Sequence, residues 1–134
     1  MAPRLRDASD PGEWLRRGRS NLSRCRGDQR LSDVLFEDLC FDAQQAAEKA
    51  IKAVLVLRRR RFPKTHDLPE LLDLVATTGL EVPPEVLDAK RLTPYAVAGR
   101  YPGVSEDASE EDYREALEIA ERVFAWAERL VSGR

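Results

Sequence analysis

The stretch FDAQQAAEKAIKAVLV, residues 41–56, lies in the middle of the longest helix that the sequence predicts, over about residues 31–61. Apolar residues recur at the spacing of one helix face; they are Leu31, Leu35, Leu39, Ala43, Ala46, Ala50, Val54 and Leu57. The alanines favour a helix and let a neighbouring helix approach closely. We expect Ser32 or Asp33 to cap the start. Pro63 should end the helix, because the residue before a proline is driven out of the α region.

Shorter helical patterns flank this central stretch. One covers about residues 12–26, and its shared apolar face consists of Trp14, Leu15, Gly18, Leu22 and Cys25. The next helix begins at Asp67, where the sequence DLPE is typical of a capping box with Asp67 at the N-cap and Glu70 at N3. We expect this helix to close at Gly79, since glycine commonly follows the last turn.

The second half of the chain adds two further helices. One is expected over about 84–92, with an interruption at Pro94 where Thr93 caps a new turn. Residues 99–109, GRYPGVSEDAS, are typical of a loop. The last helix, about 110–131, begins at a cap formed by Ser109 and Asp112 and carries a strongly periodic apolar seam.

Short connections between amphipathic helices favour an all-α fold. We predict an antiparallel up-and-down four-helix bundle with an additional short helix. It should form one domain over residues 1–134, with a core at about 12–131 and roughly ten flexible residues at the N-terminus.

Composition narrows the class of protein. The chain has 134 residues, 43% hydrophobic and 34% charged, without an apolar run long enough for a membrane span or an h-region typical of a signal peptide. We therefore expect a cytoplasmic protein in which Cys25 and Cys40 are reduced. Two cysteines and one histidine make a structural zinc site improbable, so we expect no metal and no cofactor.

Charge is distributed unevenly along the chain. Residues 1–66 carry fifteen Lys and Arg against nine Asp and Glu, whereas residues 67–134 carry seven against fifteen. The two halves could pair within the fold or between subunits, or they could leave a basic patch for phosphates. The sequence does not choose between these arrangements.

The stretch RRRRFPKTH, residues 58–66, ends in the single histidine of the chain. An imidazole can take a proton from a ribose 2′-hydroxyl, and a guanidinium can hold the scissile phosphate. His66 with Arg59, Arg60 or Arg61 is therefore a candidate catalytic set, to which Lys64 could add phosphate attraction. The alternative is structural: the arginines complement the dipole of a helix end and His66 stabilises the turn that follows.

Two further features could bind a ligand or be purely structural. Arg100 and Tyr101 could bind a phosphate and stack on a base, or Tyr101 could pack on the bundle while Arg100 pairs with a carboxylate. Gln44 and Gln45 lie among alanines, so at least one of them is expected to be buried and to need a hydrogen-bond partner. Glu48 and Lys52 form an ordinary i,i+4 pair.

Four motifs in series resemble the small HEPN domains of bacteria and archaea. They are FDAQQAAEKAIKAVLV (41–56), KTHDLPELL (64–72), GRYP (99–102) and SEEDYREALEIAERV (109–123). The resemblance covers about residues 12–131 and implies a helical bundle that is usually dimeric. It also implies a frequent pairing with a minimal nucleotidyltransferase in a two-gene toxin–antitoxin module.

The resemblance bears on the candidate site as well. Many HEPN domains are metal-independent endoribonucleases in which four to six residues separate an Arg from a following His. Arg59, Arg60 and Arg61 match this pattern with His66, since six, five and four residues lie between them. Leu68 stands where some relatives carry a tyrosine that the partner enzyme modifies, and Asp42 stands where relatives often have a histidine.

Two functions follow as hypotheses. The first is a metal-independent endoribonuclease, or toxin component, in which His66 is the general acid or base and an arginine holds the phosphate. The second is a non-catalytic helical dimerisation module that binds a nucleotide or docks on a nucleotidyltransferase. A plain oligomerisation domain without a ligand is a third possibility.

Overall fold

The computed structural model describes residues 7–27, 33–96 and 107–133. This described part contains α-helices, one 3-10 helix and no strand, which confirms the predicted all-α class. The elements in chain order are α1 (Pro11–Arg26), α2 (Phe36–Leu57), α3 (Leu68–Thr77), α4 (Pro84–Leu87), the 3-10 helix η1 (Asp88–Ala96) and α5 (Glu110–Ser132).

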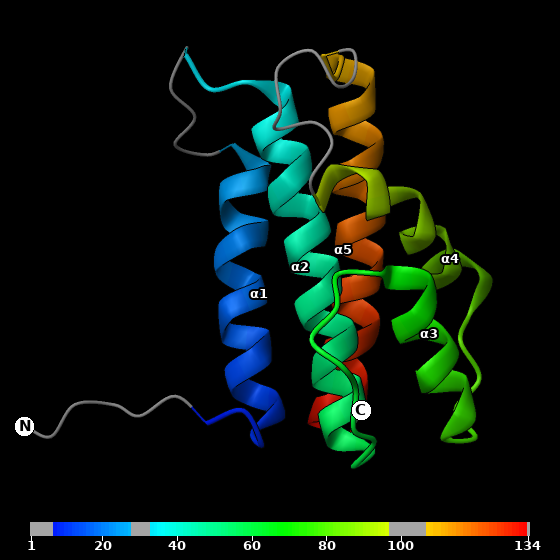
Figure 1. Cartoon of the computed structure of the whole chain (residues 1–134). Helices are drawn as coiled ribbons and strands as arrows, with labels where there is room; N and C mark the ends of the chain where they lie inside the picture. Colours follow the sequence, from blue (N-terminus) through cyan, green and yellow to red (C-terminus); the bar gives the residue numbers. More distant parts are fainter. Residues whose placement is uncertain (1–6, 28–32, 97–106, 134) are drawn as a thin grey trace, which may run out of the picture.

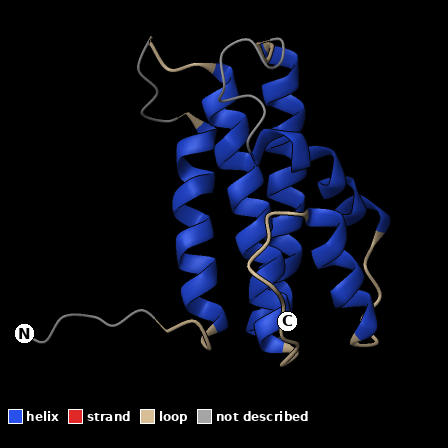
Figure 2. Ribbon diagram, viewed as in Figure 1, coloured by secondary structure: helices blue, strands red, loops and turns tan. Residues whose placement is uncertain are grey.

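The long helix α2 lies at the centre of the bundle (Figure 1). It packs against α1 on one side and α5 on another, and it also contacts α3 and η1. Helix α1 runs up in the view of Figure 1, α2 runs down, α4 and η1 return upward, and α5 runs down again. The ribbon diagram in Figure 2 shows α3 as the additional short helix, which lies beside the bundle of α1, α2, α5 and the α4–η1 segment. The predicted up-and-down bundle with an extra helix is thus confirmed.

Small residues allow the close packing around α2. The five alanines at 43, 46, 47, 50 and 53 are all fully buried, as their spacing predicts. Gly18 on α1 faces them: an added Cβ would lie 3.0 Å from Cε2 of Phe124 and 3.3 Å from Cβ of Lys49. The backbone of α1 therefore lies so close to α2 and α5 that only glycine fits without displacement.

The predicted start and end of α2 were both wrong. The helix begins at Phe36, where Leu35 is the N-cap without a side-chain cap bond and Asp33 lies in a turn. Ser32 lies outside the described residues. The helix ends at Leu57, so residues 58–61 are not helical and Pro63 does not stop it.

The end of α2 is a left-handed cap that does not use glycine. Arg59 has a φ of 57°, and its amide donates to the carbonyl of Val56 while the amide of Arg60 donates to that of Leu55. These two bonds form a Schellman motif, in which a left-handed residue satisfies the last carbonyls of the helix. Arginine at such a position is strained, and the chain turns back before it reaches the proline that the sequence predicts as the stop.

Other helix ends agree with the sequence to different degrees. Ser109 and Asp112 form the predicted capping box at the start of α5. Asp67 caps α3 by accepting from the amide of Glu70, but its own amide donates to Thr65 Oγ1, so the box is only half present.

The predicted α-helix over 84–92 was wrong in its extent. The α-helix stops at Leu87, and a 3-10 helix then runs from Asp88 to Ala96 through Pro94. In an α-helix the proline ring clashes with the carbonyl four residues earlier, which favours the tighter winding here. The Thr93 hydroxyl is buried without a partner among the described residues, so it does not cap a new turn.

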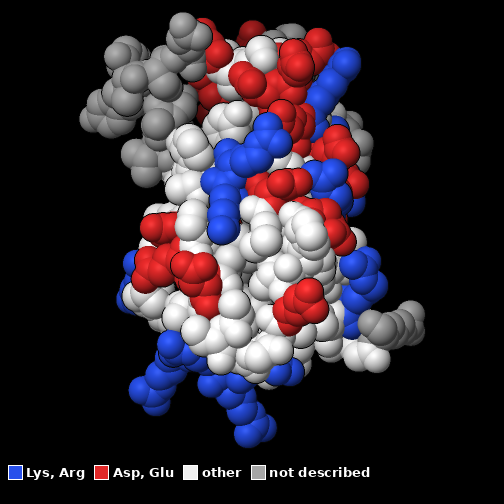
Figure 3. All heavy atoms as spheres, turned by 90° about the vertical axis from the view of Figure 1, so that its right-hand side faces the viewer, with Lys and Arg blue, Asp and Glu red and all other residues white. Residues whose placement is uncertain are grey.

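Surface charge follows the asymmetry of the sequence. Seen from the side of α3 and α4, acidic side chains gather toward the end where α5 begins, and basic side chains project from the opposite end (Figure 3). The first turn of α5 contributes Glu110, Glu111 and Asp112 to the acidic end. None of the described helices is both long and apolar enough to cross a membrane.

Candidate functional site

The segment from Arg58 to Asp67 brings the histidine back to the middle of α2. After the left-handed cap, the chain runs alongside α2 in the opposite direction before α3 begins (Figure 1). His66 Nδ1 lies 2.7 Å from Oε1 of Glu48, although the two residues are eighteen positions apart. This segment, which we call the fold-back segment, therefore makes a contact that neither α2 nor α3 contains by itself.

Glu48 is a buried carboxylate that accepts from three side chains. It is 3% exposed, and its oxygens lie 3.1 Å from Gln44 Nε2 and 3.0 Å from Lys52 Nζ in addition to the histidine. An ionised carboxylate only accepts hydrogen bonds, so Nδ1 of His66 must carry the hydrogen of this contact. In the neutral ring, Nε2 is then the nitrogen with a free lone pair.

The ring of His66 is fixed on one side and open on the other. Its side chain is 65% exposed, and no second bond to the ring is found among the described residues. Gln44 is fully buried and also approaches the backbone carbonyl of His66, with Nε2 at 3.4 Å. Gln45 donates to Gln44 Oε1 at 2.7 Å. The prediction that a buried glutamine needs partners is confirmed, and these partners hold the turn at His66.

His66 lies at a pocket of about 980 Å³ between the fold-back segment, α1 and α2. The pocket is lined by Ala8, Ser9, Trp14, Lys52, Val56, Arg59, Arg60, Arg61, Phe62, Lys64, Thr65 and His66. Five of these twelve side chains are cationic and none is acidic. Such a lining attracts an anion, because the field of several cations adds within a concave surface.

Two aromatic rings give the same pocket an apolar wall. Trp14 and Phe62 meet edge to face with their centroids 5.9 Å apart. Lys52 Nζ lies 5.7 Å from the centroid of each ring. The ammonium group is therefore held between the aromatic faces and the Glu48 carboxylate.

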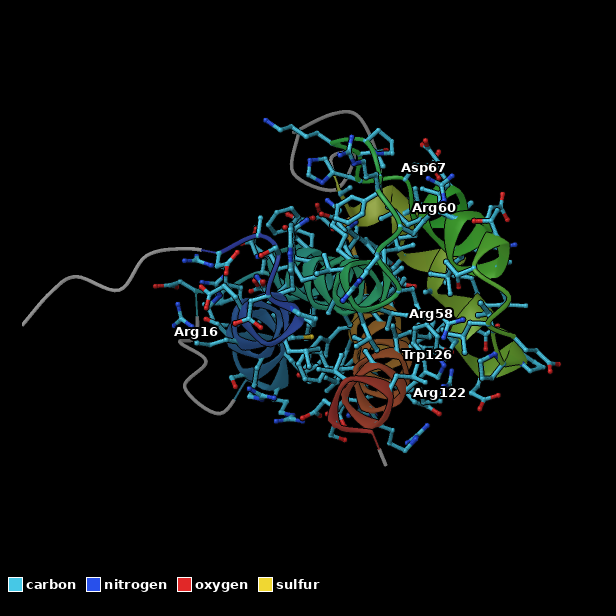
Figure 4. All side chains as sticks on the ribbon, turned by 90° about the horizontal axis from the view of Figure 1, so that it is seen from below. Arg16, Arg58, Arg60, Asp67, Arg122 and Trp126 are labelled. Atoms are coloured by element: carbon cyan, nitrogen blue, oxygen red, sulfur yellow. The ribbon has the colours of Figure 1, made fainter. Side chains whose placement is uncertain are left out.

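The four arginines of residues 58–61 take different roles. Arg58 Nη2 donates to the carbonyl of Thr78 at 2.8 Å, and Arg60 Nε lies 3.3 Å from Thr77 Oγ1, so both reach the end of α3. Figure 4, viewed from the end where α2 stops, shows both labelled side chains between that end and α3. Arg59 and Arg61 line the pocket without a side-chain hydrogen bond among the described residues.

The candidate residues from the sequence are thus largely gathered at one place. His66, Arg59, Arg60, Arg61 and Lys64 all line the pocket. Arg100 and Tyr101 lie outside the described residues, so their part in the site remains a prediction.

Sequence reasoning missed four residues of the site. Glu48 and Lys52 have the spacing of a common surface pair, but both are buried. The sequence predicts Trp14 on the core face of its helix, whereas this residue is half-buried at the pocket with Phe62. One signal in the sequence pointed to Glu48. It follows Gln44 by one helical turn, and alanines that pack in the core flank both residues, so a buried polar side chain could be expected there.

Metal ligands are not assembled here. Within residues 7–27, 33–96 and 107–133, no group of three or more His, Cys, Asp and Glu side chains could hold a metal ion. Cys25 and Cys40 are buried as free thiols. Burial raises the pKa of each thiol to about 12, so both are inert neutral groups at physiological pH.

Together, the fold and the site define a class: a small helical-bundle domain with a cationic pocket beside a histidine that a buried carboxylate orients. The HEPN domain model matches residues 12–130, and the chain belongs to the HEPN family. No curated protein matches the sequence.

Solved structures agree with this assignment. TT1696 from Thermus thermophilus is similar with a TM-score of 0.72 and 30% sequence identity, covering 89% of this chain and 96% of that chain. ST0689, an archaeal HEPN homologue, is similar with a TM-score of 0.68 and 23% identity, covering 91% of this chain and 98% of that chain. The second likeness shows the fold alone.

Proposed function

We propose that this HEPN protein is a metal-independent endoribonuclease whose general acid–base group is His66. The observation that carries the proposal is the 2.7 Å contact between Glu48 Oε1 and His66 Nδ1 at the mouth of a cationic pocket. A carboxylate that holds one ring nitrogen leaves the other nitrogen oriented for proton transfer, which is the arrangement that general base catalysis needs.

The reaction follows from the chemistry of RNA. Nε2 of His66 takes the proton of a ribose 2′-hydroxyl, and the 2′-oxygen attacks the adjacent phosphorus. The bond from phosphorus to the 5′-oxygen breaks, and the leaving oxygen receives a proton from the imidazolium. The products are a 2′,3′-cyclic phosphate and a 5′-hydroxyl, and the histidine returns to its neutral state.

The remaining residues of the pocket have roles in binding. Arg59, Arg61 and Lys64 line the pocket. In this proposal they offset the charge that grows on the phosphate in the transition state. Trp14 and Phe62 offer faces on which a base can stack. Glu48 is a positioning residue, because it acts on the substrate only through His66 and Lys52.

The test is cleavage of single-stranded RNA in EDTA by the wild-type chain and by His66→Ala. Cleavage by the wild type with cyclic-phosphate ends, lost in the variant, supports the proposal. Equal cleavage by both proteins, or none by the wild type, contradicts it.

A second candidate is a module that binds a nucleotide without cleaving RNA. It is favoured by Lys52, whose ammonium lies over both aromatic rings and is already paired with Glu48, so the cation is held in place at the pocket wall. Calorimetric titration with AMP in the absence of any RNase activity would support this candidate. A Kd that is unchanged in Trp14→Ala would count against the pocket as its site.

Assembly is a further part of the proposal. We expect a homodimer and a minimal nucleotidyltransferase partner, with this chain as the toxin or the binding component of a toxin–antitoxin module. Light scattering of the purified chain tests the first expectation. Co-purification with a nucleotidyltransferase encoded beside it tests the second.

A further inference from the structure

A second and smaller pocket lies beside α1 and α2. Its volume is about 260 Å³, and it is lined by Arg16, Arg17, Ser20, Asn21, Arg24 and Lys49. Four of the six side chains are cationic and none is acidic. The arrangement repeats the charge of the larger pocket without its aromatic wall.

Most of these cations have a carboxylate partner. Glu13, which is buried, pairs with Arg16 at 3.0 Å and with Arg17 at 3.1 Å. Arg24 pairs with Asp42 at 2.7 Å. These three guanidinium groups therefore share two carboxylates and keep a net positive charge.

Lys49 is the cation of this pocket without a carboxylate in ion-pair distance among the described residues. Its Nζ donates to Oδ1 of Asn21 at 2.7 Å, and Asn21 is itself oriented by a bond from Nδ2 to Asp42 Oδ1 at 2.9 Å. Burial lowers the pKa of Lys49, and the nearby Arg24 and Arg17 act in the same direction, whereas the carboxylates of Glu48 and Asp42 partly oppose the shift. A half-buried ammonium beside other cations is stabilised by an anion that reaches it.

The two pockets lie on the same side of the seam between α1 and α2. Lys52 approaches Trp14 at the larger pocket, and Lys49 reaches Asn21 at the smaller one. Trp14 and Asn21 are seven residues apart in α1, which places them on one face of that helix. Lys49 precedes Lys52 by three residues, or roughly 4.5 Å of helix rise, so the pockets are neighbours along the seam.

We propose that the seam between α1 and α2 continues the ligand path from the His66 pocket to a second phosphate site at Lys49 and Asn21, so that the ligand is a single-stranded RNA of several nucleotides. This inference rests on the proposed function. One phosphate lies at the His66 pocket, and a neighbouring phosphate of the same strand contacts Lys49. A row of cations along a groove is typical of proteins that bind the sugar–phosphate backbone of a single strand.

The effect of removing Lys49 follows from its position. Lys49→Met keeps much of the side-chain volume and removes one charge-assisted contact, which is worth roughly a tenfold change in Kd. Each phosphate contact to a single strand contributes about 0.7 to the slope of log K against log salt, so the slope falls by about that amount. A mononucleotide carries no second phosphate along the seam and is not affected.

The experiment measures anisotropy with a labelled 2′-O-methyl RNA of about eight nucleotides, which cannot be cleaved and falls within the usual site size. AMP is the competing mononucleotide. The wild type is compared with Lys49→Met and with Lys90→Met, since Lys90 is exposed on η1 and lines neither pocket. Lys90→Met controls for the loss of one positive charge elsewhere.

The inference predicts that the oligonucleotide binds more tightly than AMP and that Lys49→Met weakens only the oligonucleotide, while Lys90→Met changes neither. It is overturned if the oligonucleotide binds no more tightly than AMP, or if both lysine variants have the same effect. If AMP binds in a manner that depends on Trp14 while Lys49→Met changes nothing, the second site fails and the first stands. If the wild type binds neither probe, the proposed function fails and this inference fails with it.

Discussion

Oε1 of Glu48 and Nδ1 of His66 lie 2.7 Å apart, and this contact joins the centre of α2 to the turn before α3. It requires α2 to end at Leu57, because the returning segment must be long enough to reach back to Glu48. The early end of α2 depends in turn on a left-handed Arg59. Local backbone geometry at the helix end therefore positions the candidate catalytic group.

Glu48→Gln should destabilise the fold. The substitution removes the charge that Lys52 needs, and both side chains are buried, so an unpaired ammonium remains in the interior. The expected loss is about 3 kcal/mol of unfolding free energy, measured by urea denaturation. Glu85→Gln on the exposed start of α4 is the matched control and should stay within about 0.5 kcal/mol.

The double variant Glu48→Gln/Lys52→Met checks the cause of that loss. It removes the uncompensated charge and should recover part of the stability, since residues in contact are not additive. A Glu48→Gln variant as stable as the wild type would show that the buried pair contributes nothing.

Arg59→Gly should stabilise the chain. Glycine adopts the left-handed conformation without the steric cost of a Cβ, and Arg59 has a φ of 57°. The unfolding free energy of Arg59→Gly should exceed that of Arg59→Ala by about 1 kcal/mol, because both variants lose the same guanidinium and differ mainly in backbone strain. A thermal melt of the two variants decides the question: an Arg59→Ala that melts at or above Arg59→Gly contradicts the strained cap.

Trp14 should report ligand binding by its fluorescence. It lines the larger pocket, whereas the second tryptophan, Trp126, is buried in the core. AMP is expected to quench the emission of the wild type but not that of Trp14→Phe. Stacking on this side chain is worth about 1–3 kcal/mol, so Trp14→Ala should weaken AMP binding by about tenfold or more. Quenching that persists in Trp14→Phe would show that AMP binds outside this pocket.

Stability should fall in alkaline solution. Burial raises the pKa of Cys25 and of Cys40 from 9.0 to about 12, and it raises the pKa of Tyr95 from 10.0 to about 12. The unfolded chain releases these protons at lower pH than the folded chain, so the free energy of unfolding declines as pH rises between about 9 and 12. Urea melts at about pH 8 and pH 10 measure the decline, and Cys25→Ala should reduce it. Rapid reaction of the native thiols with a disulfide reagent at about pH 8 would contradict their protected state.

Local patterns predicted much of the bundle. The apolar seam and the capping box of α5 are short-range signals, and both are present in the structure. The alanine-rich face of α2 likewise predicted close packing. The end of α2 was not predictable in this way, because a left-handed cap usually carries glycine and this one carries Arg59.

The candidate site depends on contacts that the sequence does not contain. The arginine run and His66 were visible as a motif, but their meeting with Glu48, Trp14 and Lys52 results from tertiary packing. An i,i+4 pair such as Glu48 and Lys52 is most often exposed, so burial is the information that only the structure supplies.

The central claim is that His66 transfers a proton during RNA cleavage, and His66→Asn tests it most directly. The asparagine amide can replace the Nδ1 donor to Glu48, so folding and RNA binding should be retained while proton transfer is lost. The measurement is the cleavage rate of single-stranded RNA in EDTA for the wild type, His66→Asn and Glu85→Gln. The account predicts cleavage by the wild type and by Glu85→Gln, and a rate lower by about 100-fold or more for His66→Asn. A His66→Asn variant that cleaves at the wild-type rate, or a wild type that does not cleave RNA, would contradict it.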